Sequence, residues 1–252
     1  MKLPPRSSPG ADDRRAFALR KLHSLSGVVP VGLFLVLHLW SQSAALRGRA
    51  AYDATFARAE RLPLQPLLEV VLVLVPLVFH ASYGLVLTAR SRPTVGRHPT
   101  NRNWMYTAQR VTGIVSFGWI LWHLGQIWLP RMIGRIDARG VYPTLVAELS
   151  WTIHGLPLPA LVTVIGVGAA SFHLAHGLWS AAVGWGLLLT RRAQTVASAI
   201  AVVLGLGLFF LGTNVVVLFA TGARLMVVGP DPSPGDDANC TPQDAGRRGG
   251  AR

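Results

Sequence analysis

The chain has 252 residues, of which 51% are hydrophobic and only 14% are charged. Soluble domains carry about a quarter charged residues, so this composition argues against a soluble domain. The net charge of +13 comes from arginines clustered between long apolar runs, with no basic stripe interleaved with aromatic residues. The pattern argues against nucleic-acid binding and predicts an integral membrane protein whose basic flanks face lipid headgroups.

Five apolar segments are each long enough to cross the hydrocarbon core of a membrane, which takes about 20 helical residues. In chain order they are residues 22–46, 64–89, 104–130, 156–189 and 196–220. Their unbroken apolar runs exclude the alternating strands of a membrane barrel. We therefore predict an all-α integral membrane fold, a bundle of five transmembrane helices, with kinks at Pro30 and Pro76.

The two ends of the chain are polar. We predict an N-terminal arm over residues 1–21, a membrane domain over 22–222 and a tail over 223–252. The first apolar run lacks a small-residue cleavage site, so we expect the first helix to be retained rather than removed as a signal peptide. By composition the tail is disordered from Gly229 onward. It holds the one cysteine, Cys240, so the chain alone offers no disulfide and no iron–sulfur ligand set.

The distribution of lysine and arginine predicts the orientation in the membrane. With the C-terminal flank left aside, thirteen of these residues lie on the side of the N-terminus, and seven lie in the connectors on the opposite side. Because cytoplasmic flanks are the richer in positive charge, we expect the N-terminus in the cytoplasm and the C-terminus outside.

Histidine is almost the only ionisable residue within the predicted spans, where such residues are costly and usually functional. Counted from the outer helix ends at a rise of 1.5 Å per residue, His38 and His123 lie about 11–12 Å deep. On the same count His80 and His173 lie about 24–26 Å deep. Two histidines at one depth on two helices can supply both axial ligands of a haem iron. We therefore predict two haems b and an electron-transfer role.

Two glycines support the deeper pair. Gly84 and Gly177 follow His80 and His173 by four residues, on the same helix face, where a small residue leaves room for a porphyrin. Ordinary small-residue helix packing would give the same spacing. Interhelical hydrogen bonding, or a proton relay in a haem-free transporter, is the alternative for the histidines themselves. Matched depths on four helices favour haem.

Several motifs resemble the cytochrome b558 subunit family of succinate dehydrogenase, in order, over about residues 15–222. These motifs are RKLHSLSGVVPVG at 20–32, FHASYG at 79–84, NWM at 103–105, QRVTG at 109–113, WH at 122–123, FH at 172–173 and GLWS at 177–180. The resemblance implies a five-helix dihaem anchor in a bacterial inner membrane, bound to a flavoprotein subunit and an iron–sulfur subunit. A dihaem anchor of a nitrate reductase or hydrogenase is the alternative, although such anchors do not share this order of motifs.

The resemblance also implies roles for the histidines. His80 and His173 would bind the proximal haem, nearer the iron–sulfur subunit, and His38 and His123 would bind the distal haem. Succinate would be oxidised on the flavoprotein rather than on this chain. Electrons would pass through both haems to a membrane quinone, commonly menaquinone, and fumarate reduction would be the reverse direction.

Further polar residues are weaker candidates. Arg110 and His176 are expected near haem propionates. His23 and Ser24, at the mouth of the first helix, would contact propionates or the iron–sulfur subunit, although a surface position in the headgroup region explains them equally well. Glu69 is the one carboxylate well inside an apolar run. We expect it to transfer protons at a quinone site, and a helix-end carboxylate pointing to water is the alternative.

Overall fold

The computed structural model describes residues 10–91, 96 and 100–226. Apart from one isolated bridge between Ile153 and Leu156, the regular structure of these residues is helical. The α-helices are α1 Ala11–Ser26, α2 Leu33–Gln42, α3 Arg49–Glu60, α4 Gln65–Glu69, α5 Val75–Ala89, α6 Asn101–His123, α7 Leu129–Met132, α8 Ala138–Ser150, α9 Leu158–Gly184 and α10 Arg191–Thr221. The predicted disordered tail with Cys240, and the first nine residues of the predicted arm, lie outside the described residues.

Three π-helical turns join the shorter helices into continuous rods: η1 Gly27–Gly32, η3 Val70–Leu74 and η4 Leu124–Trp128. Each turn accompanies a proline, because Pro30 lies within η1 and Pro76 and Pro130 stand two residues after η3 and η4. A proline ring removes one backbone donor and clashes with the carbonyl four residues earlier. The wider π turn gives that carbonyl room.

Four of the described helical rods are long and apolar enough to cross a membrane: Ala11–Arg47, Gln65–Ala89, Leu158–Gly184 and Arg191–Thr221. The first begins eleven residues before the predicted span, because the polar residues from Ala11 continue the helix. The fourth predicted span ends earlier than expected, at Gly184, since the chain turns at Gly186, which has φ of 75°. The fifth long rod, α6 through α7, is less apolar and is not among the four.

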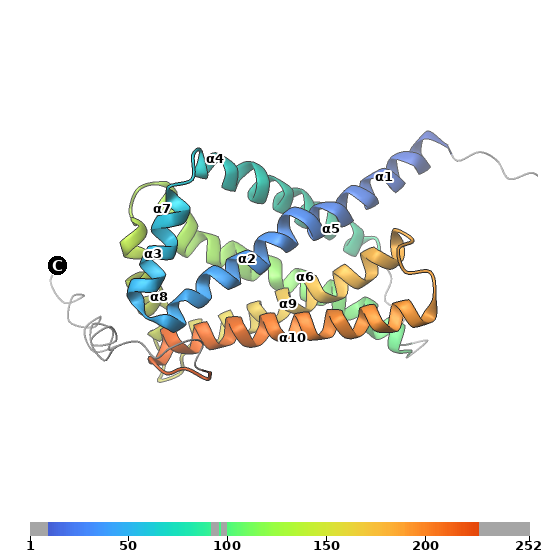
Figure 1. Cartoon of the computed structure of the whole chain (residues 1–252). Helices are drawn as coiled ribbons and strands as arrows, with labels where there is room; N and C mark the ends of the chain where they lie inside the picture. Colours follow the sequence, from blue (N-terminus) through green and yellow to red (C-terminus); the bar gives the residue numbers. More distant parts are fainter. Residues whose placement is uncertain (1–9, 92–95, 97–99, 227–252) are drawn as a thin grey trace, which may run out of the picture.

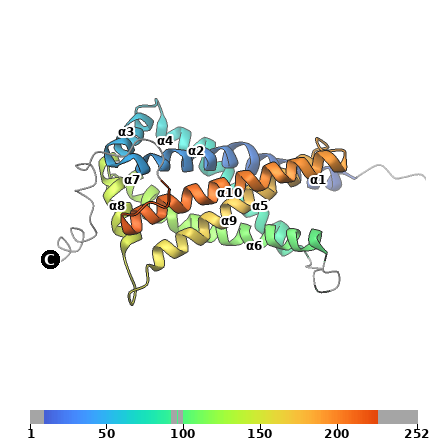
Figure 2. The ribbon, with the colours of Figure 1, turned by 60° about the horizontal axis from the view of Figure 1, so that its bottom comes forward.

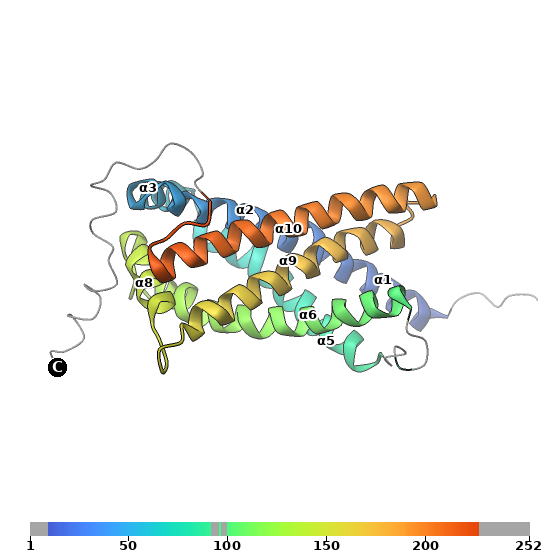
Figure 3. The same cartoon turned by 90° about the horizontal axis from the view of Figure 1, so that it is seen from below.

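The two last helices form the most tightly packed part of the bundle. α9 lies between α10 and α6, and Figure 3 shows α9 and α10 running side by side. Small residues permit this approach. A Cβ atom at Gly205 would lie 2.9 Å from Cβ of Ala175, and one at Gly212 would lie 2.6 Å from Cγ1 of Val167. The α1–α2 rod and α5 complete the bundle, as Figure 2 also shows.

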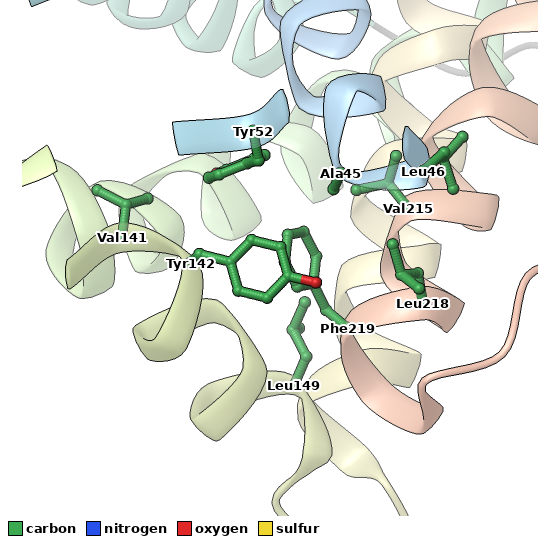
Figure 4. Close-up of a cluster of buried hydrophobic side chains, with 9 residues drawn as sticks. All are labelled: Ala45, Leu46, Tyr52, Val141, Tyr142, Leu149, Val215, Leu218 and Phe219. Carbon is green, nitrogen blue, oxygen red and sulfur yellow. The ribbon is translucent and has the colours of Figure 1, made fainter. Parts of the chain in front are cut away.

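Two helices that the sequence analysis left as connectors, α3 and α8, lie with α7 at one end of the bundle (Figure 1). We call α3 and α8 the helical cap. Tyr52 of α3 is fully buried, and its hydroxyl donates a hydrogen bond of 2.9 Å to Oε1 of Gln42. Around it is a buried cluster, drawn in Figure 4, of Ala45, Leu46, Val141, Tyr142, Leu149, Val215, Leu218 and Phe219. The cap therefore closes this end of the bundle with a small hydrophobic core.

Candidate functional site

A cavity of about 840 Å³ runs between the helices. Its walls include His38, His80, His123 and His173, the four residues predicted to bind haem. At one end it extends beneath the helical cap, where Leu145 and Leu149 of α8 line it. One continuous space thus connects the predicted ligands from four different helices.

The histidines at the cap end of the cavity face each other. His38 lies on α2 and His123 is the last residue of α6, and their ring centres are 6.0 Å apart with planes inclined at 76°. Phe34 stacks on His38 at 5.3 Å between centres, and Trp119 stacks on His123 at 5.4 Å. Apolar rings therefore limit the positions that both imidazoles can take.

The other two histidines have the same arrangement. The ring centres of His80 on α5 and His173 on α9 are 6.1 Å apart, with planes at 84°. Nδ1 of His80 donates to the carbonyl of His23, and Nδ1 of His173 donates to the carbonyl of Gln109, both at 3.0 Å. Such bonds place the ring proton on Nδ1, as in metal-binding histidines, and leave the lone pair of Nε2 available to a metal.

These distances fit a metal ion held between two imidazoles. With a metal–nitrogen distance of about 2.0 Å, two rings on opposite sides of one ion have centres roughly 6 Å apart. No group of three or more His, Cys, Asp or Glu side chains with metal-binding geometry occurs among the described residues. A two-ligand arrangement suits haem, because the porphyrin supplies the other ligands of the iron.

Glycines of neighbouring rods make room for these imidazole rings. Room for a porphyrin at Gly84 and Gly177, which both line the cavity, stays a prediction. Gly27 and Gly113 approach the rings of His80 and His173, and a Cβ at Gly113 would lie 2.9 Å from Cε1 of His173. A Cβ at Gly84 would instead lie 3.1 Å from Cε1 of His23, although Gly84 still lines the cavity. Sequence spacing finds glycines on a ligand's own helix, but not glycines on the neighbouring one.

The weaker candidates at this end are His23, Ser24 and Arg110, and all three line the cavity. His23 stacks on His80 at 4.1 Å between ring centres, and its buried Nδ1 has no hydrogen-bond partner. Ser24 Oγ accepts a 3.3 Å bond from Nε1 of Trp185. Arg110 lies over the Tyr106 ring and donates to its carbonyl, whereas its buried Nε has no partner. His23 and Arg110 thus retain a free polar atom for a ligand.

Gln109 is a residue that sequence analysis quoted within a motif but gave no role. Its Nε2 donates to the carbonyl of His173 at 3.1 Å, and its Oε1 accepts from Nδ1 of His176 at 3.0 Å. His176 is not among the residues that line the cavity. Gln109 therefore fixes the segment that carries His173 through three hydrogen bonds. The side chain of Gln109 makes two of them, and its backbone carbonyl accepts the third from Nδ1 of His173.

Carboxylates line the cavity at its cap end. Glu69 accepts a hydrogen bond from Gln65, and its Oε1 lies 3.9 Å from Nη1 of Arg131. Sequence analysis missed a second carboxylate, Glu148 of α8, which accepts a 3.1 Å bond from Nε2 of Gln126. The sequence offered one signal for this pair. Gln126, the partner of Glu148, follows the predicted ligand His123 by three residues and so lies about one helical turn from it.

Comparisons with known proteins identify the family of the chain. No family model and no solved structure matches the chain. The chain is 32% identical over 207 residues to the succinate dehydrogenase cytochrome b558 subunit of Bacillus subtilis (strain 168). The aligned region covers 81% of this chain and 98% of the relative. A likeness of this extent shows the family, and the chain belongs to the succinate dehydrogenase cytochrome b558 subunit family.

Proposed function

We propose that this protein is the dihaem membrane anchor of a succinate dehydrogenase and passes electrons to a membrane quinone. The observation that carries the proposal is the pairing of four histidines, with ring centres 6.0 Å apart in one pair and 6.1 Å in the other. Haem, when bound between such pairs, supplies reversible one-electron transfer and has no open position for oxygen. His38 and His123 would hold the distal haem, and His80 and His173 the proximal one.

The protein's own residues orient the ligands and protect them. Backbone carbonyls of His23 and Gln109 fix the rings of His80 and His173 in the tautomer that exposes Nε2. Such outer partners commonly change metal affinity 10- to 100-fold. The unpartnered Nε of Arg110 and the Nδ1 of His23 would bind propionate carboxylates, which supports the roles expected for both residues.

The proposal includes a fifth membrane crossing by α6. Part of its low hydropathy comes from residues that satisfy their polar groups within the protein. Thr107 and Thr112 donate to carbonyls of their own helix, and Gln109 bonds to α9. The exposed side of the helix is apolar, with Val111 53% and Leu121 54% exposed. A helix with this distribution can face lipid with its apolar side and the cavity with its polar side.

Partners and location follow from the family. We expect a flavoprotein and an iron–sulfur subunit at the cytoplasmic end, nearer His80 and His173, in a bacterial inner membrane. The quinone, with menaquinone expected, would bind at the cap end of the cavity, which Glu69 lines together with His38 and His123. Glu69 is already paired with Arg131, so a role in proton transfer would require it to leave that pair.

Haem analysis of single variants tests the proposal. His38→Ala and His123→Ala should each abolish the distal haem, and His80→Ala and His173→Ala the proximal one. The content of each haem is measured in purified complex by reduced-minus-oxidised spectra and pyridine haemochrome assay. Loss of one haem per variant, with matching spectra within each pair, is the expected result. Two haems in any of the four variants, or none in the native protein, would refute the assignment.

A further inference from the structure

We propose that Glu148, oriented by Gln126, is the residue that donates protons to the quinone at the cap end of the cavity. The inference rests on the proposed function and extends it to a group that the sequence motifs do not contain. Glu148 lies near the end of α8, and Gln126 lies within η4. The hydrogen bond between them, at 3.1 Å, connects the helical cap to the rod that carries His123.

The position of this pair suits a quinone ring. Gln126 follows His123 by three residues, which is about 4.5 Å along a helix axis. Both Gln126 and Glu148 line the cavity that also reaches His38 and His123. The remaining wall around them includes Ile127, Leu145 and Leu149, which would contact an apolar ring. A few polar groups in a mainly apolar cavity are what orient a small ligand.

The surrounding charges distinguish Glu148 from Glu69. Glu69 lies 3.9 Å from the guanidinium of Arg131, which also binds Glu60 at 3.4 Å. Proton uptake by Glu69 would break that ion pair. Among the described residues, the polar contact of Glu148 is the neutral amide of Gln126. Glu148 can therefore gain and lose a proton without breaking an ion pair, as a general acid must.

The chemistry balances as follows. Reduction of a quinone to a quinol takes two electrons, which succinate oxidation on the partner subunits supplies, and two protons. For each proton, the carboxyl O–H bond of Glu148 breaks as an O–H bond forms on a quinone oxygen. A hydronium ion from the solvent at the cap end protonates the remaining carboxylate again and leaves a water molecule. Gln126 can hold the carboxylate in place by donating to it throughout.

Glu148→Gln tests the inference in the whole membrane-bound complex. This variant keeps the shape and the bond to position 126 but has no proton to transfer. Quinone reduction by succinate should fall 100-fold or more, as for loss of a general acid, while succinate still reduces both haems to the native extent. Glu148→Asp should restore part of the rate with an altered pH profile. Asp53→Asn is the matched control, because Asp53 lies on α3 of the helical cap, pairs with Arg49 and does not line this cavity.

Each result is decisive. Native quinone reduction in Glu148→Gln would overturn the inference, and so would loss of a haem, which would make Glu148 a structural residue. An equal loss in Asp53→Asn would also overturn it, because the effect would then be general to acids at this end. If the native complex itself contains no haem or does not reduce quinone, the proposed function fails rather than this inference.

Discussion

At the scale of single residues, Gly113 sets how closely α6 approaches the imidazole of His173. A Cβ at this position would lie 2.9 Å from Cε1 and 3.2 Å from Nδ1 of His173. Because the ring is also held by the carbonyl of Gln109, it cannot move away without breaking that bond. Gly113→Ala should therefore lower the content of the proximal haem severalfold and spare the distal one. Pyridine haemochrome assay with low-temperature spectra measures both.

Gly118 provides the control for this substitution. It lies on the same helix, and a Cβ there would meet no atom within 4 Å. Gly118→Ala should retain both haems at native content. If both variants lost haem alike, a change in α6 itself would explain the loss, and the specific role of Gly113 would be wrong.

Gln109 is the second residue that holds His173 in position, through hydrogen bonds of its side chain. Gln109→Leu keeps the volume but removes the bonds to the carbonyl of His173 and to Nδ1 of His176. Since such supporting bonds change metal affinity about 10- to 100-fold, the variant should release the proximal haem faster. The rate of haem transfer to apomyoglobin measures this. Gln194→Leu, which removes one hydrogen bond to the carbonyl of Leu188 near the start of α10, should release haem at the native rate.

At the scale of helices, the apolar runs predicted the long rods well because each run must satisfy its backbone within itself in lipid. The helical cap was missed for a physical reason. α3 and α8 are short and of mixed polarity, so their helical state depends on burying Tyr52 and Tyr142 against Phe219 of α10. Only the packed structure brings these three rings together.

Tyr52 gives a test of the cap. Burial raises the pKa of Tyr52 above its ordinary value, so the folded state favours the neutral phenol. The stability that this contributes is present below a pH of about 10 and is lost as the pH rises further. Tyr52→Phe should cost about 1 kcal/mol at pH 8, through the lost bond to Gln42. Above pH 10 the variant should lose stability less steeply than the native protein. Thermal unfolding in detergent from pH 8 to 11 measures both, and parallel curves would contradict the account.

At the scale of the whole molecule, the histidine pairs could be predicted because a membrane helix measures depth at a fixed rise per residue. The count placed His38 with His123 and His80 with His173, and the structure brings the same rings together. Helix depth does not say which backbone carbonyl meets an imidazole. Whether the carbonyl of Gln109 meets His173, and whether Glu148 meets Gln126, depends on how neighbouring rods are rotated about their axes. Hydropathy does not predict that rotation.

The number of membrane crossings fixes the sides on which the two termini lie. Five crossings place them on opposite sides, whereas four, with α6 outside the membrane, would place them on the same side. The native Cys240 and a Gly10→Cys variant in a Cys240→Ser background test this by labelling with a membrane-impermeant maleimide. We expect Cys240 to react in intact spheroplasts and the cysteine at position 10 only after permeabilisation. Labelling of both from one side would mean that α6 does not cross. Contact with lipid would then no longer explain why α6 has an exposed apolar face, formed by Val111, Ile114 and Leu121.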